Sequence, residues 1–259
     1  VKYISTRTIG ADHIDLTAAK ELGLKVCNSN YAPNGVADYT VMLILLSLRK
    51  YKPALWRAQV NDYSLAGLQG RELRNLTVGI LGTGKIGAAV IKNLSGFGCR
   101  ILASDIRENP SLKGLCTYVD NETLYKACDI ISLHMPLLDS TRHFVNAETI
   151  AKMKDGVTII NCARGELMHI PDMIRGIETQ KIGALALDVF DKEDGIYHEN
   201  RRDDIISNRD MAYLRQFPNV IMTQHMAFYT DAAVQSMVFC GIEGLCDFAK
   251  TGHTETELV

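Results

Sequence analysis

Several features that define other protein classes are missing from this chain of 259 residues. Its seven cysteines are scattered, odd in number and form no C-x-x-C pair, which excludes a disulfide framework and a zinc site and favours a reducing compartment. The longest apolar run, residues 41–46, is far too short to span a membrane, and no signal-peptide pattern is visible. We therefore expect a cytoplasmic protein without a membrane partner.

Positive and negative charges are nearly balanced in this chain. The chain has 28 Lys and Arg against 30 Asp and Glu, for a net charge of −2, and lacks the basic stripe that a nucleic-acid partner requires. It contains no Ser/His/Asp nucleophile elbow and no metal-ligand spacing, so we expect no bound metal. A hydrophobic content of 47% is enough for the core of one or two domains.

A complete dinucleotide-binding pattern is present. An apolar run at residues 78–81 leads into a G-x-G-x-x-G turn, a helical pattern and a second apolar run that ends at Asp105. The turn consists of Gly82, Thr83, Gly84, Lys85, Ile86 and Gly87. Its glycines permit a tight turn, a close pyrophosphate and a close helix, and the helix N-terminus attracts phosphate. A glycine-rich turn without a ligand is the alternative.

Asp105 indicates which dinucleotide is bound. Its carboxylate would accept hydrogen bonds from the ribose hydroxyls and would repel a 2′-phosphate, so we expect NAD rather than NADP. The nearby Arg107 weakens this preference slightly.

Beyond Asp105 the strand and helix patterns continue to alternate, which is typical of a parallel, doubly wound α/β sheet of the Rossmann type. Strands are predicted near residues 117–119, 130–133, 157–161, 184–187 and 220–223. Residues 36–49 are apolar nearly all round and predict a buried helix.

Chemically useful side chains follow these strands directly. His134, Arg164, Asp188 and His225 all lie just past a predicted carboxyl end, the edge where ligands bind in an open parallel sheet. Residues far apart in the chain are therefore expected to meet in one cleft. His134, which precedes Met135 and Pro136, is expected to form part of the cofactor pocket wall rather than to be a catalyst.

His225 is the candidate acid/base, because its pKa suits proton transfer near neutral pH, although a histidine in a loop can also be purely structural. Asp188, Asp191 and Glu193 share one loop, and their spacing does not choose which carboxylate orients the ring. Arg164 could hold a substrate carboxylate with two hydrogen bonds, or could form only a surface ion pair.

Seven segments together resemble the D-2-hydroxyacid dehydrogenase family over essentially the whole chain. These segments are TRTIGADHID, YAPNGVADYT, GILGTGKIG, LHMPL, MKDGVTIINCARGEL, GALALDVFDKE and PNVIMTQHMAFYT. The long charged connection after Glu193 and the AFYT ending resemble the D-lactate dehydrogenase subgroup, which includes the vancomycin-resistance type. Gln224 replaces a usual proline, Met226 a small or polar residue, and Met168-His169 a Val-Asp pair.

The resemblance implies a role for each matching residue. Arg164 would bind the substrate carboxylate and polarise the carbonyl, Glu193 would pair with the catalytic His225, and Asp188 would contact the nicotinamide carboxamide. The implied cofactor site consists of Gly82, Thr83, Gly84, Lys85, Ile86, Gly87, Asp105, His134, Met135, Pro136, Cys162, Ala163 and Asp188. The implied substrate site consists of Ile9, Gly10, Tyr31, Arg164, Phe228 and Tyr229.

The resemblance also implies two α/β domains and a homodimer. We expect residues 1–34 to be part of a smaller flavodoxin-like substrate domain, residues 35–226 to form the NAD-binding domain, and residues 227–259 to return to the substrate domain. The substrate domain is expected to lack its N-terminal part. The predicted function is NADH-dependent reduction of pyruvate to D-lactate. Alternatives are an aryl-pyruvate or 2-oxoglutarate substrate, or a non-catalytic NADH-sensing corepressor.

Overall fold

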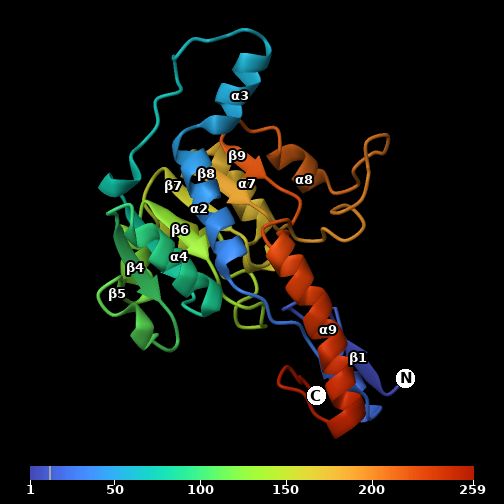
Figure 1. Cartoon of the computed structure of the whole chain (residues 1–259). Coiled ribbons are helices and arrows are strands. Elements are labelled where there is room, and N and C mark those ends of the chain that lie inside the picture. Colours follow the sequence, from blue (N-terminus) through green and yellow to red (C-terminus); the bar gives the residue numbers. More distant parts are fainter. Residues whose placement is uncertain (12) are drawn as a thin grey trace. The chain divides into compact units, whose positions relative to one another are not determined.

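The computed structural model describes residues 1–11 and 13–259 and divides them into two compact units. A small unit contains Val1–Gly35 and Phe228–Val259, and a large unit contains Val36–Ala227. In Figure 1 the chain is coloured along its sequence, so the small unit is seen in the dark blue and the orange-to-red ribbons. Asp12, part of one family-like segment, lies outside the described residues.

The large unit is built around a seven-stranded sheet with the order β5-β4-β3-β6-β7-β8-β9. Its strands are β3 (Thr77–Leu81), β4 (Arg100–Ser104), β5 (Thr117–Tyr118), β6 (Ile130–Leu133), β7 (Val157–Asn161), β8 (Ile182–Leu187) and β9 (Val220–Met222). Every neighbouring pair is parallel. The strand order reverses between β3 and β6, which confirms the doubly wound Rossmann-type prediction and locates the switch point of the sheet.

The central strands are continuous apolar runs because both of their faces are covered. Every residue of β6 and β7 is buried, including the polar Ser132 and Asn161. The helices of this unit are α2 (Asn34–Leu48, which begins in the small unit), α3 (Tyr51–Gln59), α4 (Lys85–Ser95), α5 (Asn121–Ala127), α6 (Ala147–Lys152), α7 (Ile170–Glu178) and α8 (Arg209–Leu214). Short 3-10 turns occur at Leu73–Asn75, Pro110–Leu112 and Gly165–Leu167.

Helix α2 differs from its prediction on one side. Val41, Leu43 and Ile44 are buried as expected, but Met42 is 38% exposed. The next helix, α3, has no buried residue. The apolar pattern therefore predicted the helix correctly, but it predicted more burial of α2 than the structure shows.

The small unit contains a parallel β-α-β element and a long helix. Strands β1 (Tyr3–Ser5) and β2 (Lys25–Cys27) are joined through α1 (Leu16–Glu21), and α9 (Asp231–Thr251) packs against both strands. The rings of Tyr3 and Phe248 stack with centroids 5.3 Å apart. A Cβ atom on Gly244 would lie 2.6 Å from the Cys27 sulfur, so glycine is required for this approach of α9 to β2.

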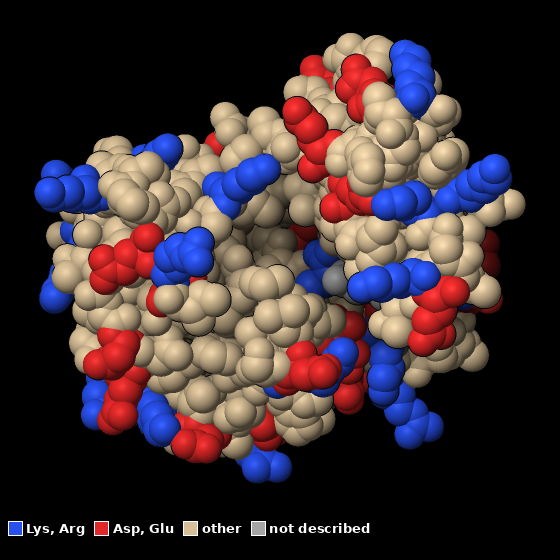
Figure 2. Space-filling model, turned by 90° about the horizontal axis from the view of Figure 1, so that it is seen from below, with Lys and Arg blue, Asp and Glu red and all other residues tan. Residues whose placement is uncertain are grey.

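Among the described residues, α9 alone is long and apolar enough to cross a bilayer. Length and composition are weak indicators here, because a core helix of a soluble protein passes the same test. On the face seen in Figure 2, basic and acidic side chains are mixed across the surface, as the small net charge leads one to expect.

Candidate active site

The glycine turn after β3 has the geometry that a bound pyrophosphate needs. Gly82 has a φ of +94°, and a Cβ atom there would lie 2.7 Å from the His134 carbonyl oxygen. A Cβ atom on Gly87 would lie 2.0 Å from the Gly82 oxygen, so α4 can approach only because residue 87 is glycine. A Cβ atom on Gly84 would meet nothing within 4 Å. The turn is thus closely packed at Gly82 and Gly87, and it leaves open space at Gly84, where α4 begins. This space fits a phosphate group.

Asp105 lies at the end of β4, beside this turn. Its carboxylate accepts hydrogen bonds from the N–H and the hydroxyl of Thr83 and from the N–H of Arg107. Burial raises the pKa of Asp105, but these hydrogen bonds outweigh burial and lower the pKa below its ordinary value. The carboxylate is therefore charged at neutral pH, as recognition of ribose hydroxyls requires.

His134 follows β6 and faces the same turn. Its N–H donates to the Leu81 carbonyl at 2.7 Å, and its ring Nε2 lies 2.9 Å from the Ser132 hydroxyl. Burial lowers the pKa of His134 to about 4, so the ring is neutral at physiological pH. A neutral ring beside the phosphate turn suits a pocket wall and not a proton donor.

The Asn-Cys-Ala-Arg-Gly turn after β7 is held by its own first residue. The Asn161 amide donates to the Arg164 carbonyl at 2.8 Å and accepts from the Ala163 N–H at 2.9 Å. A Cβ atom on Gly165 would lie 2.1 Å from the Phe190 carbonyl carbon, so the turn packs directly on the loop after β8. Burial raises the pKa of the Cys162 thiol to about 12, which excludes a reactive thiolate beside Arg164.

The loops after β8 and β9 join a carboxylate to a histidine. A Glu193 oxygen accepts a hydrogen bond from Nδ1 of His225, and the other oxygen accepts the Phe190 N–H at 2.7 Å. The His225 side chain is 29% exposed and that of Glu193 is 22% exposed. Of the three acids that the sequence left open, Glu193 is the one bonded to the ring in this structure.

Asp188 has a structural task that the sequence did not reveal. Its fully buried carboxylate accepts the Thr223 hydroxyl at 2.7 Å and the N–H groups of Met226 and Ala227 at 3.0 and 2.8 Å. Its own carbonyl accepts the His225 N–H at 2.6 Å. Asp188 therefore fastens the segment that carries His225, whereas its position at a strand end and the family resemblance pointed only to a place in the cofactor site.

Five of the implied substrate residues belong to the small unit, namely Ile9, Gly10, Tyr31, Phe228 and Tyr229. The loop after β1 is held by Thr8, whose hydroxyl donates to the Gly10 carbonyl at 2.6 Å, and by Asn28, whose amide donates to the Ile9 carbonyl at 2.7 Å. Ile9 is 37% exposed. The rings of Phe228 and Tyr229 meet edge to face with centroids 6.0 Å apart.

The departures from the family pattern have different surroundings. Met168 is fully buried in the core, and His169 bonds Asp172 at 2.8 Å at the start of α7, so both have a structural explanation. Gln224 is exposed and directly precedes His225. Within residues 1–11 and 13–259, no cluster of three or more His, Cys, Asp or Glu side chains could hold a metal.

Known proteins resemble this chain over most of its length. The family described as D-isomer specific 2-hydroxyacid dehydrogenase, NAD binding domain, matches residues 41–227. An aromatic 2-oxoacid reductase of Clostridium sporogenes is 44% identical over all of this chain and 79% of its own length. A D-specific alpha-keto acid dehydrogenase of Enterococcus faecium is 40% identical over 98% of this chain and 78% of its own length.

Solved structures show the same relationship. A D-lactate dehydrogenase from Treponema pallidum superposes with a TM-score of 0.92 at 32% identity, covering all of this chain and 79% of the other. The Aquifex aeolicus D-lactate dehydrogenase, solved with NAD and lactic acid, gives a TM-score of 0.90 at 34% identity over 96% of this chain and 77% of the other. The chain therefore belongs to the D-2-hydroxyacid dehydrogenase family and is an NAD-dependent oxidoreductase of small 2-oxo and 2-hydroxy acids.

Proposed function

We propose that Arg164, Glu193 and His225 are the catalytic residues of this chain and that they reduce a 2-oxoacid to a D-2-hydroxy acid. The observation that carries the proposal is the hydrogen bond between Glu193 and Nδ1 of His225. It joins the loops after β8 and β9 at the carboxyl edge of the sheet, next to the turn that presents Arg164.

The substrate carboxylate is assigned to Arg164. A guanidinium presents parallel N–H donors that match both oxygens of a carboxylate, and it also withdraws electron density from a neighbouring carbonyl. The Asn161 side chain holds the turn that carries Arg164 by two hydrogen bonds, so the backbone of this turn is fixed before substrate binds. In the small unit, Ile9, Gly10, Tyr31, Phe228 and Tyr229 are proposed to contact the same substrate.

We assign the transfer of the proton to the substrate to His225. Because Nδ1 is hydrogen-bonded to Glu193, the ring presents Nε2 to the substrate, and Nε2 is the atom that delivers the proton to the carbonyl oxygen. The Glu193 carboxylate orients the ring through this hydrogen bond. Proton transfer by a positioned group contributes roughly 10²–10⁴-fold to a rate.

Bound NADH supplies the hydride that reduces the carbonyl carbon. The turn from Gly82 to Gly87 and the carboxylate of Asp105 would hold its phosphates and ribose. The remaining cofactor contacts are assigned to His134, Met135, Pro136, Cys162, Ala163 and Asp188. Asp188 also fixes the backbone on either side of Met226, so the cofactor wall and the His225 loop share one anchor.

For the substrate we propose an aromatic 2-oxoacid such as phenylpyruvate, ahead of pyruvate. Support comes from relatives named aromatic 2-oxoacid reductases, which are 44% identical to this chain, whereas two relatives named D-lactate dehydrogenases are 38% identical. Pyruvate, predicted from the sequence, is the second candidate. A sensor without catalysis is disfavoured by the intact Glu193–His225 bond.

The test is a panel of 2-oxoacids assayed with NADH at 340 nm. We expect the highest kcat/KM for phenylpyruvate, a lower value for pyruvate, and the D-enantiomer as product. A ranking led by pyruvate or 2-oxoglutarate would replace the proposed substrate without changing the chemistry.

Catalysis itself is tested with His225→Ala. We expect kcat to fall by roughly 10²–10⁴-fold, because the proton donor is lost, while NADH affinity measured by fluorescence stays within about twofold. Equal turnover in the wild-type and variant chains would refute the assignment of His225. NADH binding without turnover of any 2-oxoacid would favour the sensor.

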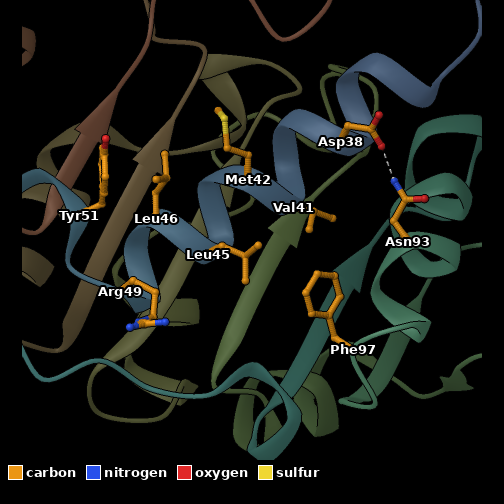
Figure 3. A pocket seen from close by; sticks show the side chains of 9 residues that line it. All are labelled: Asp38, Val41, Met42, Leu45, Leu46, Arg49, Tyr51, Asn93 and Phe97. Carbon is orange, nitrogen blue, oxygen red and sulfur yellow. Dashed lines mark hydrogen bonds between the residues drawn. The ribbon is translucent and has the colours of Figure 1, made fainter.

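We further propose that the chain forms a homodimer through α2. An open pocket of about 670 Å³ lies along this helix, and Figure 3 shows the apolar side chains that enter it. They are Val41, Met42, Leu45, Leu46, Tyr51 and Phe97, with Asp38 and Asn93 hydrogen-bonded at 2.7 Å on one rim and Arg49 on another. Helix α3 next to it exposes half of Tyr51 and 46% of Trp56. Exposed apolar and aromatic side chains that lie together in this way are typical of surfaces that a second subunit covers.

We also propose that residues 1–34 and 227–259 belong to the substrate domain and residues 35–226 to the NAD domain. The two compact units of the structure, which divide after Gly35 and after Ala227, support this assignment. A cytoplasmic location is proposed on the seven cysteines, which all carry free thiols in this structure.

A further inference from the structure

The loop between β8 and α8 contacts His225 at two points. Glu193 bonds the side chain, and His198, five residues further along, places Nε2 3.0 Å from the His225 carbonyl oxygen. The two imidazole rings have centroids 6.1 Å apart at an angle of 47°, so they do not stack and each keeps its own hydrogen bonds. The second contact is to the main chain.

The shape of this loop accounts for the double contact. The N–H groups of Ile196 and Tyr197 both donate to the Glu193 carbonyl at 3.0 Å, which turns the chain back toward β9 directly after Glu193. Ile196 and Tyr197 pack against the hydrophobic core. His198 is the next residue; its backbone has a φ of +63° and the residue is exposed.

The backbone of His225 needs such support because it is strained. Its φ of +51° lies in the left-handed region, which costs a residue with a Cβ atom of order 1 kcal/mol or more unless the surroundings hold it. The Asp188 carbonyl accepts the N–H of His225 at 2.6 Å, and thus fixes the peptide before the residue. In the peptide after His225, the Met226 N–H donates to the Asp188 carboxylate, and the His225 carbonyl accepts from His198.

The residue before His225 adds no restraint of its own. Gln224 is exposed, and its side chain does not fix φ as the ring of a proline at that position would, near −65°. The direction of the His225 ring therefore depends on what holds its own backbone. Nε2–H of His198 is a side-chain donor to the His225 carbonyl in this structure.

We propose that His198 is a positioning residue for the reaction, which donates a hydrogen bond from Nε2 to the His225 carbonyl and fixes the direction of the catalytic ring. This inference rests on the proposed function, since His225 is its acid/base. The loop then acts as a two-point clamp: Glu193 sets the rotation of the ring and His198 sets the backbone that carries it.

The test compares His198→Gln with His198→Phe in the whole chain. Gln places an amide N–H near the position of Nε2, and Phe keeps the size of the ring without a donor. We expect Phe to lower kcat about tenfold, the effect of losing one hydrogen bond of about 1.4 kcal/mol, with KM and NADH affinity changed less than about twofold. Gln should restore kcat to within about threefold of the wild-type value.

A readout independent of turnover keeps this inference separate from the proposed function. We expect the ¹H NMR signal of Nδ1–H of His225 to be protected from water exchange in wild type and His198→Gln, and to broaden in His198→Phe. A sharp signal together with unchanged kcat in His198→Phe would overturn the inference, as would equal losses in Gln and Phe. A wild-type chain without 2-oxoacid turnover would refute the proposed function alone, and the NMR comparison would still decide the role of His198.

Discussion

At the scale of single residues, the same side-chain type has different chemistry at different strand ends. His134 and His225 both follow a strand of the same sheet, but His134 lies against the glycine turn with a pKa lowered to about 4, and His225 meets a carboxylate. Burial disfavours the charged form of His134, whereas the Glu193 carboxylate holds the ring of His225 by a hydrogen bond. The two histidines are thereby divided into a neutral wall and a candidate proton donor.

The lowered pKa of His134 predicts that the protein loses stability in acid. The unfolded chain takes up a proton at this residue near pH 6.5, while the folded chain resists it until about pH 4, so the unfolded state binds more protons in this interval. Stability should therefore fall as pH falls through this window, by about 2 kcal/mol.

Urea unfolding at pH 7.0 and 5.0 measures this effect. We expect His134→Gln to reduce the difference in unfolding free energy between the two pH values by about 1–2 kcal/mol. The control is His253→Gln, at a ring that is 77% exposed. An identical pH dependence in wild type and His134→Gln would show that this ring is solvated.

At the scale of elements, a lysine in α3 links the start of the chain's large unit to its last strand. The Lys52 ammonium donates to the carbonyls of Arg215, Phe217 and Val220 at 2.7, 2.8 and 2.7 Å. These carbonyls lie between the end of α8 and β9, where helix termination leaves acceptors without partners. Strand β9 leads directly to His225, so this link supports the candidate site from a distance.

Replacing Lys52 with methionine should loosen this connection. We expect a loss of about 2 kcal/mol, because hydrogen bonds to a charged group are worth roughly 1.5–3 kcal/mol and water can replace part of them. That loss corresponds to a fall in Tm of about 4–8 °C for a chain of this size. Differential scanning calorimetry measures the change, with Lys92→Met on the exposed side of α4 as the matched control. Equal Tm values for the two variants would show that the three contacts add nothing to stability.

At the scale of the whole molecule, the surface of the large unit is unevenly covered. Helix α2 buries one side against its own unit and opens the other into the pocket of Figure 3. Helix α3 beside it exposes Tyr51, Leu55 and Trp56. A second copy covering this surface would bury residues that a monomer leaves in water.

The proposed dimer predicts the effect of a charge in this pocket. Leu45→Glu should convert the dimer to a monomer, because a carboxylate buried in an apolar interface without a partner costs several kcal/mol. Sedimentation velocity measures the outcome, and Leu22→Glu, at a residue 74% exposed in the small unit, is the control. A monomeric wild-type chain, or a dimeric Leu45→Glu variant, would exclude this surface as the interface.

By itself, the sequence determined the elements and their order. The period of its apolar residues, the glycine spacing of 82, 84 and 87, and the acid at 105 require a strand, turn, helix and strand locally, and a parallel sheet follows from their alternation. The positions of Arg164 and His225 at strand ends followed for the same reason.

Only the tertiary structure decided which groups meet. Asp188, Asp191 and Glu193 are equivalent by spacing, and the turn after Glu193 places the partly buried Ile196 and Tyr197 against the core. The buried role of Asp188 and the contact from His198 depend likewise on the path of a long loop, about which local periodicity carries no information. Local sequence pattern acts over a few residues, whereas these contacts join segments more than twenty-five residues apart, and folding of the whole unit sets their distance.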